Sequence, residues 1–505
     1  MTCRRILLLL AGAVLTACGG SAPSIAPTIS SFQATPDTVL AGGTTTLSWT
    51  VSGDAPITLQ LTPDVGDVSG SNDVQVSPDT TTTYTLTATN DVESDSATLT
   101  VTVQPVVALR GTVIGMNGDP ASGIDVLVHA GGRLPQTTGS DGTFDFGEVP
   151  TPYDVTVHDA AAEHSVTYVG LTLAEPTLLM LGTTTGPRHQ TVVQGEVTGG
   201  FGYPEPADGW THVAFGSDDT RIDRRADATT GTFAFDPVAW FGPLRTEGRL
   251  HALQWRAGPD GLPTSYSGYA QQALTLESTV PVQAGQTLNV VPVDEGVVSG
   301  ATPIPAGYSP FARTLSIQFD DGASIVVAGE LGFSEGFSYR TPHVGDGDPT
   351  LAATAIGPSD SGGFAVLPDL PYATSGVELA VPIASTLSEP ADGVAGVDTT
   401  TDFRWSSPVK RVHLVRFQSS SGPDVDVVSG ANRAALPDLD ALGASHATGT
   451  GYTWRVFGLE PYEDVDAVAY TDDAFLSAWF YSTFFQPVRP AKLSQSSQRS
   501  FTTAP

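Results

Sequence analysis

Cysteine and basic residues are scarce in this chain. It has two cysteines among 505 residues, Cys3 and Cys18, and 22 basic residues against 54 acidic ones. With both cysteines at the N-terminus, no disulfide is expected within the domains that follow. The formal net charge of −32 repels phosphate backbones, so we do not expect nucleic acid as a partner. We interpret this charge as serving solubility.

Long apolar runs are equally scarce. The run from Ile6 to Leu15 follows Arg4 and Arg5 and is too short to span a bilayer. A charged start, a short apolar run and small residues before a cut site are the parts of an export signal. We therefore predict that residues 1–17 form a signal peptide, and no second membrane segment is visible after it.

The residues Leu15-Thr-Ala-Cys18 resemble the lipobox of bacterial lipoproteins. The resemblance implies that Cys18 is lipidated and becomes the mature N-terminus, and acylation accounts for a lone thiol in an exported protein. The alternative is an ordinary secretory signal with Cys18 beside the cut by chance. The residue after Cys18 is Gly19 rather than Asp, and in this the chain resembles lipoproteins that are sent to the outer membrane. We expect an exported protein, anchored through Cys18 in the bacterial cell envelope, with residues 18–27 as a flexible tether.

The rest of the chain has the pattern of β-structure. Residues 44–51 and 83–89 alternate polar with apolar side chains and are separated by Gly, Asp and Pro clusters, which predicts short strands of a sandwich. Residues 28–105 resemble a bacterial immunoglobulin-like domain, with Trp49 on an early strand and Tyr84 on a late one. Because this domain has no cysteine pair, hydrophobic packing must close its two sheets. We predict an all-β chain of tandem β-sandwich domains.

Residues 106–185 resemble the carboxypeptidase regulatory-like domain, a small transthyretin-like sandwich. The resemblance rests on the segments Leu109-Arg-Gly-Thr-Val113, Gly118-Asp-Pro-Ala-Ser-Gly-Ile-Asp-Val-Leu-Val128 and Thr138-Gly-Ser-Asp-Gly-Thr-Phe-Asp-Phe146. The residues alone predict a tight turn at Asp141-Gly142 and place Phe144 and Phe146 on one face of a strand. The family is named for its association with peptidases, but the domain carries no catalytic residues.

Three further β domains follow. Residues 190–293 repeat the regulatory-like pattern in Thr230-Gly-Thr-Phe-Ala-Phe235, and residues 294–382 form a β-sandwich of uncertain type. Residues 383–505 resemble a fibronectin type III-like domain, through Thr401-Asp-Phe-Arg-Trp405, Tyr452-Thr-Trp-Arg-Val456 and Arg499-Ser-Phe-Thr-Thr503. This last domain departs from the pattern by an insertion over 459–497, which is too long for a hairpin connection.

The insertion holds the most aromatic stretch of the protein, residues 472–486. One interpretation is a short amphipathic helix, capped at Asp472, that packs on the last sandwich. The other exposes the rings to grip a partner or a sugar. Trp479, Tyr481 and Phe484 are the candidate binding residues for a glycan or protein ligand.

Catalytic and metal-binding patterns are weak. Gly332-Phe-Ser-Glu-Gly336 fits the nucleophile-elbow string, but its surroundings lack the strand-to-helix turn that this motif needs. The acidic turns at Asp218-Asp219, Asp320-Asp321 and Asp346-Gly-Asp348 complete no calcium loop and are read as solvated turns. His158 and His164 are expected at the surface. We predict a non-catalytic envelope lipoprotein without cofactor or metal, acting as a structural, adhesive or binding module; the alternative is a carbohydrate-binding accessory protein or an enzyme of polysaccharide processing.

Overall fold

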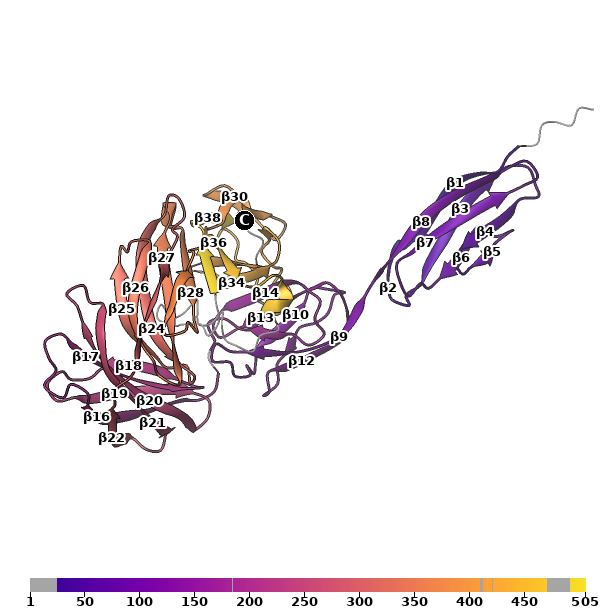
Figure 1. The fold of residues 1–505 in the computed structure, drawn as a ribbon. Helices are drawn as coiled ribbons and strands as arrows, with labels where there is room; N and C mark the ends of the chain where they lie inside the picture. Colours follow the sequence, from indigo (N-terminus) through magenta and orange to yellow (C-terminus); the bar gives the residue numbers. More distant parts are fainter. Residues whose placement is uncertain (1–24, 184, 409–411, 420, 470–490) are drawn as a thin grey trace, which may run out of the picture. The chain divides into compact units, whose positions relative to one another are not determined.

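The computed structural model describes residues 25–183, 185–408, 412–419, 421–469 and 491–505 (Figure 1). Strands make up 59% of the chain and helices 2%, which confirms the predicted all-β class of tandem β-sandwiches. The chain divides into two compact units, one ending at Val106 and one running from Val107 to Pro505. No helix of the described residues has the length and apolar character that a membrane crossing requires.

The first unit is an immunoglobulin-like sandwich. Its strands are β1 (Thr28–Thr35), β2 (Thr38–Leu40), β3 (Thr45–Ser52), β4 (Thr58–Thr62), β5 (Gly66–Asp67), β6 (Asp73–Val76), β7 (Thr82–Thr89) and β8 (Ser94–Gln104). They form two sheets, of order β1-β3-β6 and β2-β8-β7-β4-β5. Trp49 and Tyr84 are both 5% exposed and meet in the core between the sheets. Hydrophobic packing therefore closes this sandwich, as the sequence predicted.

The end of the predicted tether is held by the first unit. The backbone N–H of Ile25 donates to Asp54 Oδ2 over 2.8 Å, and the Asn90 side-chain amide donates to the carbonyl of Ile25 over 2.8 Å. Residues 25–27 thus belong to the sandwich, while Cys18 and the signal peptide lie outside the described residues.

The region predicted to be regulatory-like, 106–185, forms a small two-sheet sandwich. Its strands are β9 (Val106–Ile114), β10 (Asp125–Val128), β11 (Gln136–Thr137), β12 (Thr143–Pro150), β13 (Tyr153–Asp159), β14 (His164–Leu171) and β15 (Thr177–Leu179). Phe144 and Phe146 point to one face, as predicted, and their rings lie 6.0 Å apart in the core. Asp141 and Gly142 form the turn before β12, and Gly142 has φ +70° in close approach to the Val113 carbonyl.

The region 190–293 has its own core between two sheets, β19-β16-β22 and β18-β17-β20-β21. Its strands are β16 (Arg188–Gly199), β17 (Gly209–Ser217), β18 (Arg221–Arg225), β19 (Thr232–Phe241), β20 (Arg245–Ala257), β21 (Pro263–Glu277) and β22 (Val282–Val290). The second face of the β17-β20-β21 sheet carries Ala214, Leu253 and Trp255, which pack into the core of the next region.

The region 294–382 completes that shared core. Its strands are β23 (Glu295–Ala301), β24 (Ser309–Phe319), β25 (Ser324–Leu331), β26 (Gly336–Pro342), β27 (Gly347–Ile356), β28 (Gly362–Leu367) and β29 (Thr374–Glu378), with a 3-10 turn η1 (Pro358–Asp360). One sheet has the order β26-β23-β29, and the other strands join a much larger sheet.

The last region, 383–505, is a sandwich with strands on both sides of a core around Phe403, Trp454 and Phe501. Its elements are β30 (Thr386–Glu389), β31 (Val394–Val397), β32 (Phe403–Ser406), β33 (Val412–Ser419), β34 (Asp424–Ser429), β35 (Arg433–Ala434), η2 (Asp440–Leu442), β36 (Gly451–Glu460), α1 (Val465–Val468), β37 (Ala491–Gln495) and β38 (Arg499–Thr503). The sheet β30-β32-β35 covers one side of this core.

One continuous sheet connects three of these regions (Figure 1). β14 of the regulatory-like region pairs in parallel with β34 of the last region, from His164 opposite Asp424 to Val169 opposite Ser429. At the other side, β37 pairs with both β36 and β28, and so joins the last region to the fourth. Edges that independent domains would leave unpaired are thereby used to join them.

The predicted insertion over 459–497 forms part of these connections. Its described parts are α1, whose N-terminus is capped by Asp464, and the strand β37. Val465 and Val468 of α1 pack into the core of the regulatory-like region, and Asp466 accepts hydrogen bonds from the backbone and hydroxyl of Thr172. The insertion therefore ties the last region to two others.

Candidate functional site

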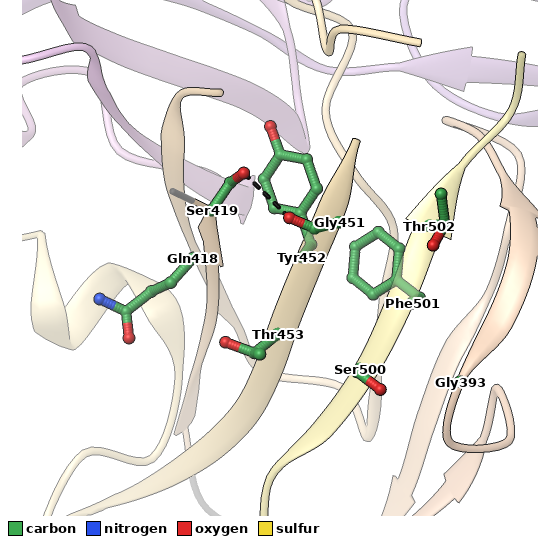
Figure 2. A pocket seen from close by; sticks show the side chains of 9 residues that line it. All are labelled: Gly393, Gln418, Ser419, Gly451, Tyr452, Thr453, Ser500, Phe501 and Thr502. Atoms are coloured by element: carbon green, nitrogen blue, oxygen red, sulfur yellow. Dashed lines mark hydrogen bonds between the residues drawn. The ribbon is translucent and has the colours of Figure 1, made fainter. Parts of the chain in front are cut away.

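A groove of about 610 Å³ lies on the last region, beside β33, β36 and β38 (Figure 2). The residues that line it are Gly393, Gln418, Ser419, Gly451, Tyr452, Thr453, Ser500, Phe501 and Thr502. The lining consists of hydroxyl, amide and aromatic side chains and glycine backbone, and no lining residue carries a charge.

Strand register places the polar side chains of the groove on one face. Gln418 lies opposite Thr453, and Thr453 lies opposite Ser500, so the three form a row across three strands (Figure 2). Alternate residues such as Tyr452 and Phe501 point to the opposite face, where both are 2% exposed within the core. The groove is thus the outer side of a sheet whose inner side is fully packed.

Some groove side chains are already hydrogen-bonded within the protein. Ser419 Oγ donates to the Gly451 carbonyl over 2.9 Å, and Ser500 Oγ donates to Asp392 Oδ1 over 2.9 Å. The Gln418 amide and the Thr453 hydroxyl have no hydrogen-bond partner among the described residues, and the same is true of the Thr502 hydroxyl. These three groups are available to a ligand.

The aromatic side chains beneath the groove are buried and stacked on one another. The rings of Tyr452 and Phe501 are stacked with centroids 5.4 Å apart and an interplanar angle of 8°. Burial, with the nearby charge of Asp424, raises the pKa of Tyr452 to about 12, so its hydroxyl stays protonated at neutral pH. The groove therefore offers hydrogen bonding without an ionisable group poised for acid–base chemistry.

A buried charge cluster lies where β14 meets β34, and we call this pairing with its cluster the ladder seam. Arg416 donates to both oxygens of Asp426, over 2.8 and 2.9 Å, and His164 Nε2 lies 3.0 Å from Asp426 Oδ2. Burial alone would raise the pKa of Asp426, but Arg416 and the hydrogen bond from His164 hold it below its usual value. His164 and His158 are buried, at 8% and 4% exposure, so their expected surface positions were wrong: both lie on strands inside the joined sheet.

A second cluster joins β20 and β21 to the turns before β25 and β27, and we call its five residues, Arg249, His251, Tyr269, Asp321 and Asp346, the side-chain seam. His251 is fully buried, with Nε2 2.8 Å from Asp321 Oδ2 and Nδ1 2.7 Å from the Tyr269 hydroxyl. Tyr269 donates to Asp346 Oδ1 over 2.9 Å, and Arg249 reaches both carboxylates, at 3.4 and 3.2 Å.

The polar atoms of the side-chain seam bond one another. Burial would raise the pKa of Asp321, but the hydrogen bond and charge of His251, with Arg249, lower it. Two of the predicted acidic turns, at residues 320–321 and 346–348, supply the carboxylates. Among the described residues, no group of three or more His, Cys, Asp or Glu side chains is arranged to hold a metal ion. This cluster is an interface between regions.

The Gly332–Gly336 segment is a turn organised by a buried arginine. It leads from β25 to β26, with no helix after Ser334. Arg313, 1% exposed, donates to the carbonyls of Ser334, Glu335 and Gly336 and pairs with Glu330 at 2.8 Å. The nucleophile-elbow match is therefore accidental.

The sequence-predicted site residues and the groove do not coincide. Cys18, Trp479, Tyr481 and Phe484 all lie outside the described residues, so they stay predictions. The groove residues were missed, although the sequence held a signal for them. Tyr452 and Trp454 belong to a segment predicted to be a strand of the last sandwich, and the period of two in a strand places Thr453 on the face opposite to theirs.

Comparisons with known proteins add no functional assignment. The chain matches no protein-family model and no curated protein sequence. Among solved structures it is similar to the Bacillus anthracis TIE protein, with 13% identity over 72% of this chain and 75% of that chain and a TM-score of 0.17. A fimbrial assembly protein from Parabacteroides distasonis matches with 10% identity over 44% of this chain and 97% of that chain, with a TM-score of 0.18. The immunoglobulin domains 1–5 of Sidekick-1 match with 9% identity over 95% of this chain and 99% of that chain, with a TM-score of 0.16. Scores this low carry no argument about function.

Proposed function

We propose that this chain is a non-catalytic structural or adhesive module of the bacterial cell envelope, held at the membrane by a lipid on Cys18. The lipobox-like residues Leu15 to Cys18 support the anchor. The only other cysteine, Cys3, lies within the predicted signal peptide, which supports a dedicated role for the Cys18 thiol. Gly19 after the cysteine supports the outer membrane as the destination.

The joining of regions by strand pairing is the observation that carries the structural role. Between Val107 and Pro505, the ladder seam, the side-chain seam and the insertion fix neighbouring sandwiches to one another. Domains on flexible linkers reorient freely, whereas a shared sheet and shared cores resist bending. A stiff body suits a protein that projects a binding surface or transmits load.

The buried charges support a role without catalysis. Asp426 bonds to His164 and Asp321 bonds to His251, each across a region boundary, and none of the nine residues that line the groove is a carboxylate. Glycoside hydrolysis ordinarily needs two carboxyl groups on either side of a sugar-binding cleft. The groove therefore fits the binding of a ligand better than an enzyme of polysaccharide processing.

Substitution of Cys18 tests the anchor. We expect the parent protein in the membrane fraction, with a mature N-terminal peptide that begins at an acylated Cys18 and shows the added mass by mass spectrometry. Since two or more acyl chains are needed for stable anchoring, C18S should leave the membrane fraction. Cys3→Ser, within the predicted signal peptide, is the matched control, and this variant should remain in the membrane fraction. A processed C18S protein that stays firmly in the membrane would overturn the proposal.

A further inference from the structure

The groove on the last region is neutral in a strongly acidic protein. The chain carries 54 acidic residues, yet none of the nine residues that line this groove is charged, and the neighbouring carboxylate of Asp392 is engaged by Ser500. Two arginines on the same face are already engaged: Arg455 is half-buried and donates to the side-chain oxygen of Gln498, and Arg416 pairs with Asp426. The net charge of −32 repels anions at long range, so an uncharged ligand suits this groove better than an acidic one.

Two glycines keep the groove open. Gly451 on β36 and Gly393 before β31 have free space where a side chain would begin. At these positions a ligand can approach the backbone closely, as glycine allows wherever the main chain contacts a bound molecule. Gly451 has an ordinary extended backbone, so glycine is not required there by its φ angle.

The available polar groups match a ligand with many hydroxyls. The Gln418 amide can both donate and accept, and the hydroxyls of Thr453 and Thr502 can do the same. Gln418, Thr453 and Ser500 stand on adjacent strands, which are spaced about 4.8 Å apart, close to the length of one sugar ring. We propose that this groove binds a neutral glycan laid across the strands, with these side chains bonding its hydroxyls. The inference rests on the binding part of the proposed function and does not depend on the lipid.

A peptide fits the same surface less well. Recognition of an extended peptide by strand addition needs a free sheet edge. Here β36 pairs with β33 and β38, and β38 pairs with β31, so the groove lies on a sheet face whose backbone groups are already used.

The experiment fills the groove and measures glycan binding. Full-length protein carrying C18S is titrated by calorimetry with cellohexaose, mannohexaose, xylohexaose and chitohexaose, and is also applied to a glycan array. Gly451→Trp places a large side chain in the groove without backbone strain. Gly329→Trp is the matched control, because Gly329 is an exposed glycine on β25 with ordinary φ and open space before it. A milder variant, Thr453→Val, removes one hydroxyl at constant shape.

We expect at least one neutral glycan to bind, with affinity that changes little between low and high salt. Gly451→Trp should lower that affinity at least about tenfold, and Thr453→Val about fivefold, the effect of one hydrogen bond. Gly329→Trp should bind like the parent. The inference is overturned if no neutral glycan on the array binds, if binding survives in Gly451→Trp, or if only acidic glycans or peptides bind. Membrane anchoring, measured separately, is unaffected by any of these outcomes.

Discussion

The two seams join neighbouring regions by different means. The ladder seam pairs six residues of β14 with six of β34 through main-chain hydrogen bonds, and Asp426 is 1% exposed beneath them. In the side-chain seam, no described strand of the region 190–293 pairs with a strand of 294–382. There, side chains alone bridge the surfaces, and the backbones approach so closely that a Cβ on Gly216 would lie 2.6 Å from the backbone nitrogen of Ala323.

Because of this difference, we expect the two seams to tolerate different substitutions. A main-chain ladder keeps its bonds whatever the side chains are, so its sensitivity is concentrated in buried groups such as Asp426. The side-chain seam depends on every member of its cluster, but Arg249 is about a third exposed and water can replace part of its contacts. We therefore expect the largest single effect in the ladder seam and a smaller one in the side-chain seam.

The first prediction concerns Asp426→Ala. Removing this carboxylate breaks the buried ion pair with Arg416, and breaking such a pair typically costs about 3–5 kcal/mol. The thermal transition of the Val107–Pro505 unit should move to a clearly lower temperature in calorimetry. Amide hydrogen exchange should accelerate along both β14 and β34.

The control for this substitution is Asp145→Ala. Asp145 pairs with Arg110 at 2.6 Å and accepts from the Gly147 N–H over 3.0 Å, but the two paired side chains are 50% and 71% exposed, so its loss should move the transition far less than the loss of Asp426. If Asp426→Ala proves as mild as Asp145→Ala, the main-chain ladder alone holds the seam. The expectation that the largest single effect lies in the ladder seam is then wrong.

The second prediction concerns Asp321→Ala in the side-chain seam. His251 would lose its Nε2 partner and Arg249 one of two carboxylates, and because Arg249 stays partly solvated we expect a loss of about 2–3 kcal/mol. Exchange should accelerate in β20 and β25 but not in β14, since no pairing links the two seams directly.

The pH dependence sharpens this second prediction. The pKa of Asp321 is lowered in the folded protein, so its stabilisation is fully present above the unfolded value of 3.8 and is lost as pH falls through the lower folded value. The stability difference between parent and Asp321→Ala, measured by denaturant unfolding, should therefore be constant near neutral pH and shrink in acid below about pH 4. A difference that instead grows in acid contradicts this assignment.

Local features of this fold could be predicted from sequence, whereas the seams could not. Trp49, Tyr84, Phe144 and Phe146 are core residues because a strand with one buried face alternates every second residue, and that period is visible in the letters. His164 and Asp426 are 262 positions apart, and no local pattern shows that their strands pair in parallel. His164 looked like a surface residue because its partner lies in another region.

The groove could be predicted from the sequence only in part. The outward positions of Thr453, Ser500 and Thr502 follow from the same period of two that marks Tyr452 and Phe501 as core. Their register across β33, β36 and β38, which brings Gln418 into the row, depends on tertiary pairing. Aromatic rings stand out in a sequence as candidate binding residues, whereas a neutral row of hydroxyl and amide side chains leaves no such mark on the composition.

The smallest predicted effect concerns Asp466→Ala, at the tie between the insertion and the regulatory-like region. Asp466 accepts from the Thr172 backbone over 2.9 Å and from its hydroxyl, and it stands on a helix of only four residues, so we expect a loss of about 1 kcal/mol. The Thr177 N–H, which donates to the Ala469 carbonyl over 2.6 Å, should exchange faster, while β34 is unchanged. Thr172→Val, which removes only the hydroxyl, should give about half the effect. If neither variant changes exchange at Thr177, the apolar contacts of Val465 and Val468 alone hold the insertion in place. The connection through the insertion is then purely hydrophobic.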